Sequence, residues 1–313
     1  MVLKTLCAEL LTKAYSRSFV NTNAASLPGK GMFFSLNTLI NQLHRHYRKY
    51  GQEGGIYLFD FKNYFGSLPH NIIKERARNI ILDDKLYKLF CSYVDDFQKM
   101  GAYNKNADKP RGVGLGSEIS QIIALDYTSP LDHYIKDILG IEGYGRYMDD
   151  GYVISNSLEE LKQIKATVEK IVQDLDLKLS DKKNYIIPFK HHSFTFLKKR
   201  FTLTKTGQVV VKISRKSIKA MRRKLKIFYK WVQENKMKFE SVVAAYQSWR
   251  ASGLQYNTYK TIESLDATFC SLFEKELADR TKKFKCYLQG RYEDNQWKYT
   301  RITSNILPTI AAA

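Results

Sequence analysis

The stretch "GYGRYMDDGYVI" (Gly143–Ile154) decides how the rest of the chain is interpreted. Strand-forming residues lie on both sides of Tyr147-Met148-Asp149-Asp150, so the pattern predicts two short strands joined at Met148-Asp149 in a tight hairpin. Two adjacent carboxylates repel each other at the tip of such a hairpin. A bound cation would offset that repulsion, so the tip is a candidate metal site.

A further carboxylate follows a short apolar run earlier in the chain. "IYLFDF" (Ile56–Phe61) comes after the turn-like Gly54-Gly55 and is typical of a buried strand that ends near Asp60. A sheet that pairs this strand with the hairpin would bring Asp60 to Asp149 and Asp150. An isolated Asp-Asp pair is more often a solvated turn. The predicted hairpin, the upstream "FDFKNYF" and the positive charge of the chain favour a metal site here.

Composition favours a globular protein with a polyanionic partner. The 313 residues are 44% hydrophobic, and 51 Lys and Arg exceed 31 Asp and Glu, which gives a formal charge of +20. Nucleic acid is the first candidate partner and an anionic membrane the second. Charged residues interrupt the N-terminal apolar stretch, so we expect a helix there, no signal peptide, and a cytoplasmic protein. The four cysteines form no CxxC pair, which argues against zinc or a disulfide framework.

The remaining patterns predict an α+β chain. Ser157 and Glu160 form an S-x-x-E capping box before an amphipathic helix through Leu175. The segments 177–189 and 194–213 predict three more strands, the last two joined in a hairpin through Lys205-Thr206-Gly207. From Ser214 the sequence is helical and basic, with eight Lys or Arg before Trp231, and further helices are expected over roughly 240–249 and 259–277.

These motifs together resemble those of the reverse transcriptases, specifically the bacterial retroelement enzymes such as those of diversity-generating retroelements and group II introns. The resemblance rests on "YLFDFKNYFGSLPH" (57–70), "GVGLGSEISQ" (112–121), "YMDD" (147–150), "LSDKKN" (179–184), "FLKKRF" (196–201) and "YQSWRASGLQYNTYKTIESLD" (246–266). It implies a right-hand polymerase fold with an antiparallel-sheet palm backed by helices. The expected domains are partial fingers (1–59), palm with interleaved fingers elements (60–213), an all-helical thumb (214–280) and a C-terminal appendix of unassigned role (281–313).

The resemblance also implies a role for individual residues. The catalytic residues would be Asp60, Asp149, Asp150 and Lys183, and the three aspartates would bind the metal, Asp60 and Asp149 directly with Asp150 assisting. Nucleotide contacts would come from Phe61, Phe65, Leu115, Gly116 and Gln121. Phe65 falls where an aromatic ring excludes a ribose 2'-hydroxyl. Nucleic-acid contacts would come from Arg215, Lys219, Arg222, Arg223, Lys226 and Trp249, with helix packing as the alternative for Trp249.

The expected activity is RNA-directed DNA synthesis from deoxynucleoside triphosphates with two Mg²⁺ ions, or Mn²⁺ in their place. The partners would be template RNA, the RNA/DNA duplex and an accessory protein or subunit, with no membrane. Leu115, where many retroelement enzymes have glutamine, implies an error-prone enzyme of the diversity-generating kind. Two alternatives stay open: an antiphage-defence reverse transcriptase with self- or protein-priming, and a non-catalytic RNA-binding subunit with incomplete fingers.

Overall fold

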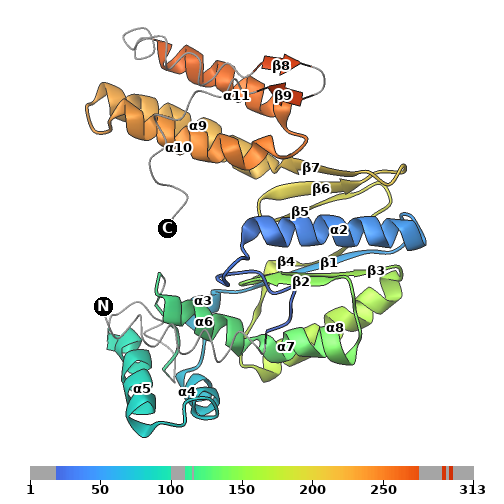
Figure 1. Ribbon diagram of the computed structural model, residues 1–313, viewed down its shortest axis with the longest axis vertical. Helices are drawn as coiled ribbons and strands as arrows, with labels where there is room; N and C mark the ends of the chain where they lie inside the picture. Colours follow the sequence, from blue (N-terminus) through green and yellow to red (C-terminus); the bar gives the residue numbers. More distant parts are fainter. Residues whose placement is uncertain (1–18, 100–109, 115, 275–290, 294–295, 299–313) are drawn as a thin grey trace. The chain divides into compact units, whose positions relative to one another are not determined.

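The computed structural model describes residues 19–99, 110–114, 116–274, 291–293 and 296–298 (Figure 1). The chain divides into two compact units, Met1–Val210 and Val211–Ala313. Each unit is described by itself below. Within the described ranges, no helix has both the length and the apolar character needed to span a membrane.

The first unit is built on an antiparallel four-stranded sheet. Its strand order is β2 (Tyr144–Tyr147), β3 (Asp150–Ser155), β1 (Gly55–Phe61) and β4 (Leu179–Pro188). The predicted hairpin is confirmed, because Tyr147 pairs with Asp150 and only Met148 and Asp149 lie between the strands. Met148 has a φ of 54°. That left-handed conformation is uncommon for a residue with a side chain.

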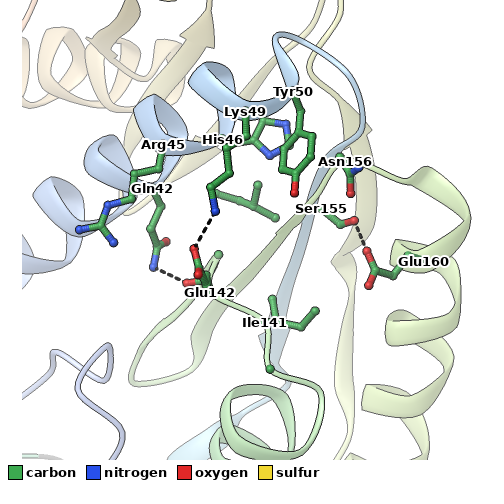
Figure 2. Close-up of a pocket in the computed structure, with 13 residues that line it drawn as sticks. Gln42, Arg45, His46, Lys49, Tyr50, Ile141, Glu142, Ser155, Asn156 and Glu160 are labelled. Atoms are coloured by element: carbon green, nitrogen blue, oxygen red, sulfur yellow. Dashed lines mark hydrogen bonds and ion pairs between the residues drawn. The ribbon is translucent and has the colours of Figure 1, made fainter.

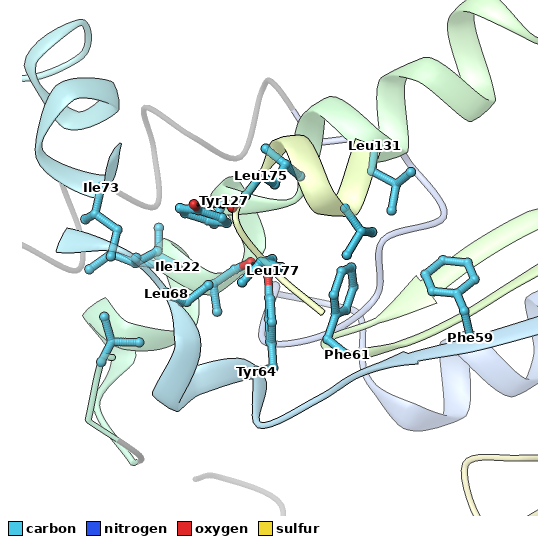
Figure 3. Close-up of a cluster of buried hydrophobic side chains, with 14 of the residues drawn as sticks. Phe59, Phe61, Tyr64, Leu68, Ile73, Ile122, Tyr127, Leu131, Leu175 and Leu177 are labelled. Atoms are coloured by element: carbon cyan, nitrogen blue, oxygen red, sulfur yellow. Dashed lines mark hydrogen bonds between the residues drawn. The ribbon is translucent and has the colours of Figure 1, made fainter. Parts of the chain in front are cut away.

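Helices cover both faces of this sheet (Figure 1). The helix α2 (Met32–Tyr50) lies on one face and α8 (Leu158–Asp174) on the other. Alternation along β1 sends Tyr57, Phe59 and Phe61 to the α8 side, where they join the main hydrophobic core (Figure 3). Asp60 therefore points to the opposite face of the sheet.

The start of α8 shows how a local signal is realised. The hydroxyl of Ser157 accepts the Glu160 amide at 3.2 Å, as the capping box predicts. The Glu160 carboxylate accepts from the hydroxyl of Ser155, and that hydroxyl accepts the Ser157 amide at 3.0 Å. The second half of the capping box is thus relayed through Ser155. The apolar face of the helix is buried as its periodicity predicts, through Leu161, Ile164 and Val168.

Shorter helices fill the same unit beside the sheet. They contribute Ile73, Ile122, Tyr127 and Leu131 to the core in Figure 3, together with Leu68 between α3 and α4, and with Leu175 and Leu177 beyond α8. Their bounds are α3 (Tyr64–Ser67), α4 (His70–Arg78), α5 (Asp84–Lys99), α6 (Glu118–Tyr127), α7 (Ser129–His133) and the π-helix η1 (Tyr134–Ile138).

A separate antiparallel sheet follows β4 and corrects one prediction. It contains β5 (Ser193–Phe196), β6 (Lys199–Leu203) and β7 (Val209–Ile213), so the region 177–213 holds four strands where we expected three. The additional break is a two-residue turn at Leu197 and Lys198, with φ of 45° and 63°. Such turns normally carry Asn-Gly. Leu-Lys gives no turn signal in the sequence.

The second unit is mainly helical. Its helices α9 (Arg215–Gln233), α10 (Phe239–Leu254) and α11 (Tyr259–Leu272) share a core that includes Leu225, Val242, Tyr246, Leu265 and Phe269. The predicted helices are therefore present, and α10 is longer than its sequence estimate. The short strands β8 (Arg291–Glu293) and β9 (Gln296–Lys298) pair with each other. Most of the expected appendix 281–313 lies outside the described residues.

Gly151, directly after the aspartate pair, offers a test of core packing in the first unit. A Cβ at this position would lie 2.1 Å from Cζ of Phe59. We expect Gly151→Ala to lower the free energy of unfolding by about 1–3 kcal/mol, the usual cost of overpacking. Denaturant unfolding of the purified variant measures this.

Gly31→Ala is the matched control, because no atom lies within 4 Å of a Cβ built at Gly31. Gly31 is the N-cap of α2, where alanine is less favourable than glycine, so we expect a cost below about 1 kcal/mol that comes from the cap alone. Equal stability of the two variants would contradict the close approach of Phe59 to Gly151.

Candidate active site

The register of β1 against β3 places the acidic residues at one end of the sheet. Asp60 and Asp150 are direct cross-strand partners. The Phe61 amide donates to the carbonyl of Asp149 at 3.2 Å, which fixes the hairpin turn against the end of β1. Partners across an antiparallel pair share one face of the sheet. The structure thus brings together three aspartates that are separated by about 90 positions in the sequence.

The carboxyl groups of Asp60 and Asp149 are close enough to share a hydrogen bond. Burial is the main cause that raises the pKa of Asp60, to about 6, and the charges of Asp150 and Asp149 raise it further. Burial, followed by the charge of Asp150, also raises the pKa of Asp149. Without a cation, the pair therefore tends to retain a proton.

Lys183 on β4 lies beside the third aspartate. Its ammonium group pairs with the carboxylate of Asp150, and it also lies 5.8 Å from the centre of the Phe196 ring. The two paired side chains are only 18% and 20% exposed, so solvent screens this ion pair less than one at the surface. Lys183 is thus placed at the acidic cluster.

The chemistry of these residues fits a divalent cation. Within the part of the chain that the structure describes, no group of three His, Cys, Asp or Glu is arranged to hold a metal. Asp60 and Asp149 converge, whereas Asp150 is held by Lys183. Mg²⁺ commonly takes one or two carboxylates and completes its shell with water and phosphate oxygens. The Asp60–Asp149 pair, with Asp150 beside it, offers such carboxylates, and the expected set of metal ligands stays a prediction.

The residues that we expect to contact the nucleotide differ in how far they are buried. Phe65 lies in α3, half-buried, with its ring 5.7 Å from that of Tyr64. Phe61 is buried, and its amide is already bonded to Asp149. Gly116 is exposed with a φ of 87°, and Gln121 is half-buried on α6. Leu115 lies outside the described residues.

The expected nucleic-acid contacts divide into two groups. The basic residues of α9 are all exposed: Arg215, Lys219, Arg222, Arg223 and Lys226. Trp249, in contrast, packs against the core of the helical unit, and its indole N–H donates to the Ser217 hydroxyl at 3.1 Å. Its contacts are those of a packing residue, which is the alternative that the sequence left open.

Arg146 and Asp132 form a buried network behind the hairpin, which no motif of the sequence indicates. Nε of Arg146 donates to Asp132 at 2.7 Å, and Nη1 donates to the Met148 carbonyl at 2.8 Å. Both side chains of this ion pair are 0% exposed. The available signal was an arginine at an inward position of an otherwise apolar and aromatic strand.

A cavity of about 310 Å³ lies elsewhere in the first unit (Figure 2). It is lined by α2, by the segment 140–143, by residues at the far end of β3 from Asp150, and by Glu160. Lys49 and Glu142 form an ion pair of 3.7 Å beside it. None of the three aspartates lines this cavity, so it is not the site of the carboxylate pair.

Comparison with known proteins identifies relatives of this architecture. Residues 3–198 match the family described as "Reverse transcriptase (RNA-dependent DNA polymerase)". No curated protein matches the chain. Telomerase from Candida albicans, in complex with a TWJ fragment of telomeric RNA, matches 91% of this chain and 49% of its own, at 11% identity and TM-score 0.53. Apo telomerase from Candida tropicalis matches 91% and 52%, at 13% identity and TM-score 0.52.

The chain spans about half the length of these telomerase structures. At such low identity the likeness concerns the fold alone. The mixed helix and antiparallel-sheet architecture, together with these matches, confirms the predicted class, a right-hand polymerase fold.

The raised pKa of Asp60 leads to a prediction for the metal-free protein. The native state holds a proton on Asp60 up to about pH 6, whereas the unfolded state loses it near pH 4. The free energy of unfolding should therefore fall as pH rises between these values. In the presence of a chelator, Asp60→Asn should reduce this decrease in the free energy of unfolding. The substitution should also stabilise the protein at pH 7.

The comparison of wild type with Asp60→Asn cancels the titrations that both proteins share. His46 and His70, whose pKa values are lowered mainly by burial, act in the opposite direction in both. Asp181→Asn, which removes an exposed carboxylate of β4 outside the pair, is the control for the loss of one negative charge. If the free energy of unfolding of Asp60→Asn varied with pH as it does in the wild type, the pKa of Asp60 would not be raised in the native state.

Proposed function

The chain belongs to the reverse transcriptase (RNA-dependent DNA polymerase) family, and we propose that it adds deoxynucleotides to a primer 3'-hydroxyl on an RNA template. The observation that supports this most directly is the Asp60–Asp149 pair at the end of β1. Two half-buried carboxylates with raised pKa values are costly to keep unless they bind a cation. A non-catalytic RNA-binding subunit would have no need for this arrangement.

In the proposed mechanism, Asp60 and Asp149 hold Mg²⁺, with Mn²⁺ as the alternative. The bound metal supplies activation of the attacking hydroxyl and stabilisation of the leaving oxygen in phosphoryl transfer. Asp150 adds negative charge beside this pair and holds Lys183 close to it. Lys183 would protonate the departing pyrophosphate or balance its charge.

The remaining chain would bind the substrates. The exposed cations of α9 would contact phosphates of the template RNA or the RNA/DNA duplex, with an affinity that falls as salt rises. Gly116 and Gln121 would lie near the incoming deoxynucleoside triphosphate. Trp249 would add an aromatic contact only through the part of its ring that is not packed against the core of its unit.

The cellular role is the finer part of the proposal. Leu115 and Gln121 resemble the residues of diversity-generating retroelement enzymes at these positions, which favours error-prone copying of a retroelement template RNA with an accessory protein. A side chain without a hydrogen-bonding group discriminates more weakly than one that has it. An antiphage-defence enzyme with self- or protein-priming is the alternative, and the neighbouring genes distinguish the two.

Loss of the metal-binding carboxylate tests the proposed activity. Asp149→Asn should reduce primer extension on an RNA template by at least about 1,000-fold in kcat, because the amide cannot replace a carboxylate toward Mg²⁺. Duplex binding, measured by fluorescence anisotropy, should be nearly unchanged. Asp181→Asn, an exposed aspartate on β4, is the control and should extend normally. Full extension by Asp149→Asn would reject the assignment.

Sugar selection tests the role of Phe65. If its ring excludes a 2'-hydroxyl, Phe65→Ala should raise the incorporation of ribonucleotides relative to deoxyribonucleotides, by about 10-fold or more for a loss of 1–3 kcal/mol. Phe65→Tyr retains the ring and should keep the wild-type ratio. Single-nucleotide incorporation kinetics give kcat/KM for each sugar. If Phe65→Ala loses stability while the ratio stays constant, Phe65 is only a packing residue.

A further inference from the structure

We propose that Arg146 is a positioning residue, which holds the hairpin turn in the conformation that presents Asp149 for metal binding. This inference rests on the proposed function, since it concerns the same carboxylate pair. Arg146 does not touch the carboxyl groups of Asp60 or Asp149 in the contacts described above. It acts through the Met148 carbonyl, one residue before Asp149.

All three nitrogens of the Arg146 guanidinium donate hydrogen bonds. Nε and Nη2 donate to the two carboxylate oxygens of Asp132, at 2.7 and 2.5 Å. Nη2 also donates to the Leu125 carbonyl at 3.1 Å, and Nη1 donates to the Met148 carbonyl at 2.8 Å. The fork of the guanidinium sets the direction of all these bonds at once. Arg146 thus connects α6 and α7 to the turn.

Asp132 is itself fixed from other sides. The Tyr144 hydroxyl donates to one of its oxygens, and the Asn23 amide donates to the other at 3.4 Å. The chain around Asn23 also lies along β2, because the Ala24 amide donates to the Arg146 carbonyl at 3.2 Å. A guanidinium paired with so constrained a carboxylate has little freedom to rotate.

The turn needs an external support because its backbone is strained. Met148, at a φ of 54°, occupies a left-handed region that is unfavourable for a residue with a Cβ. Met148 and Tyr147 pack against a small cluster of Ala25, Leu27 and Leu125. Apolar contacts are non-directional, however, and do not fix where the peptide carbonyl points. The bond from Arg146 does so.

Arg146→Lys separates positioning from a merely structural role. Lysine keeps the charge beside Asp132, but its single nitrogen cannot serve Asp132, Leu125 and Met148 together. We expect the dissociation constant of Mn²⁺ to rise about 10-fold or more, in the range typical of outer-shell changes at metal sites. In extension assays, kcat should fall by a similar factor while KM for the nucleotide stays nearly constant.

The helical unit provides a matched control. Arg250 and Asp266 form a second buried Arg–Asp pair, with Nε of Arg250 at 3.0 Å from both carboxylate oxygens. The Tyr246 hydroxyl donates to the same aspartate at 2.6 Å. Arg250→Lys should therefore lose comparable thermal stability and leave Mn²⁺ affinity unchanged. Equal effects of Arg146→Lys and Arg250→Lys on Mn²⁺ affinity would overturn the inference.

Mn²⁺ binding is measured by electron paramagnetic resonance on the full chain without primer or nucleotide, and only the part abolished by Asp149→Asn is counted. A wild-type protein that binds Mn²⁺ in this way but makes no DNA would refute the proposed function. If Arg146→Lys weakens that binding, the inference about Arg146 is still supported. A wild type without such binding, or an Arg146→Lys protein with wild-type affinity, would refute the inference.

If Arg146→Lys does not fold, Tyr144→Phe decides. It removes only the hydroxyl that fixes Asp132 and leaves both charges paired. We expect a folded protein whose Mn²⁺ affinity is about 2- to 5-fold weaker, since outer-shell bonds orient metal ligands. Unchanged affinity in Tyr144→Phe would then count against the inference.

Discussion

The antiparallel register between β1 and β3 is the constraint on which the candidate site depends. Asp60 faces Asp150 because Phe59 and Phe61 occupy the opposite, core-facing side of β1. A slip of one residue would reverse every side chain of the strand. It would turn Asp60 into the hydrophobic core and Phe59 onto the face that carries the carboxylates. The burial of aromatic side chains on one face therefore maintains the cluster of negative charge on the other.

Local patterns predicted much of this arrangement, and non-local contacts account for what they missed. Alternation and turn signals located β1 and the hairpin, and helical spacing with a cap located α8. Turn signals did not locate the break at Leu197 and Lys198, because neither residue favours a left-handed backbone, although "FLKKRF" (196–201) resembles the primer-grip hairpin of reverse transcriptases. Tertiary contacts with the neighbouring strands must stabilise it.

Within the site, the sequence indicated which groups are present but not how they pair. Lys183 pairs with Asp150 next to the place where the register of β4 against β1 shifts, between Phe59 and Phe61. Asp132 lies on a short helix with no pattern that links it to Arg146. Such pairings form only when distant segments pack together in the folded protein, so periodicity and motif spacing do not predict them.

Polar bonds also join the helices of the second unit and give its basic surface a fixed geometry. Trp249 ties α10 to α9 through Ser217, while Arg250 ties α10 to α11 through Asp266. The helices cannot slide along one another without breaking these bonds. The cations from Arg215 to Lys230 thus lie at fixed positions along a helical segment of roughly 22 Å, at 1.5 Å per residue. Adjustment to any anionic partner must come from the long side chains alone.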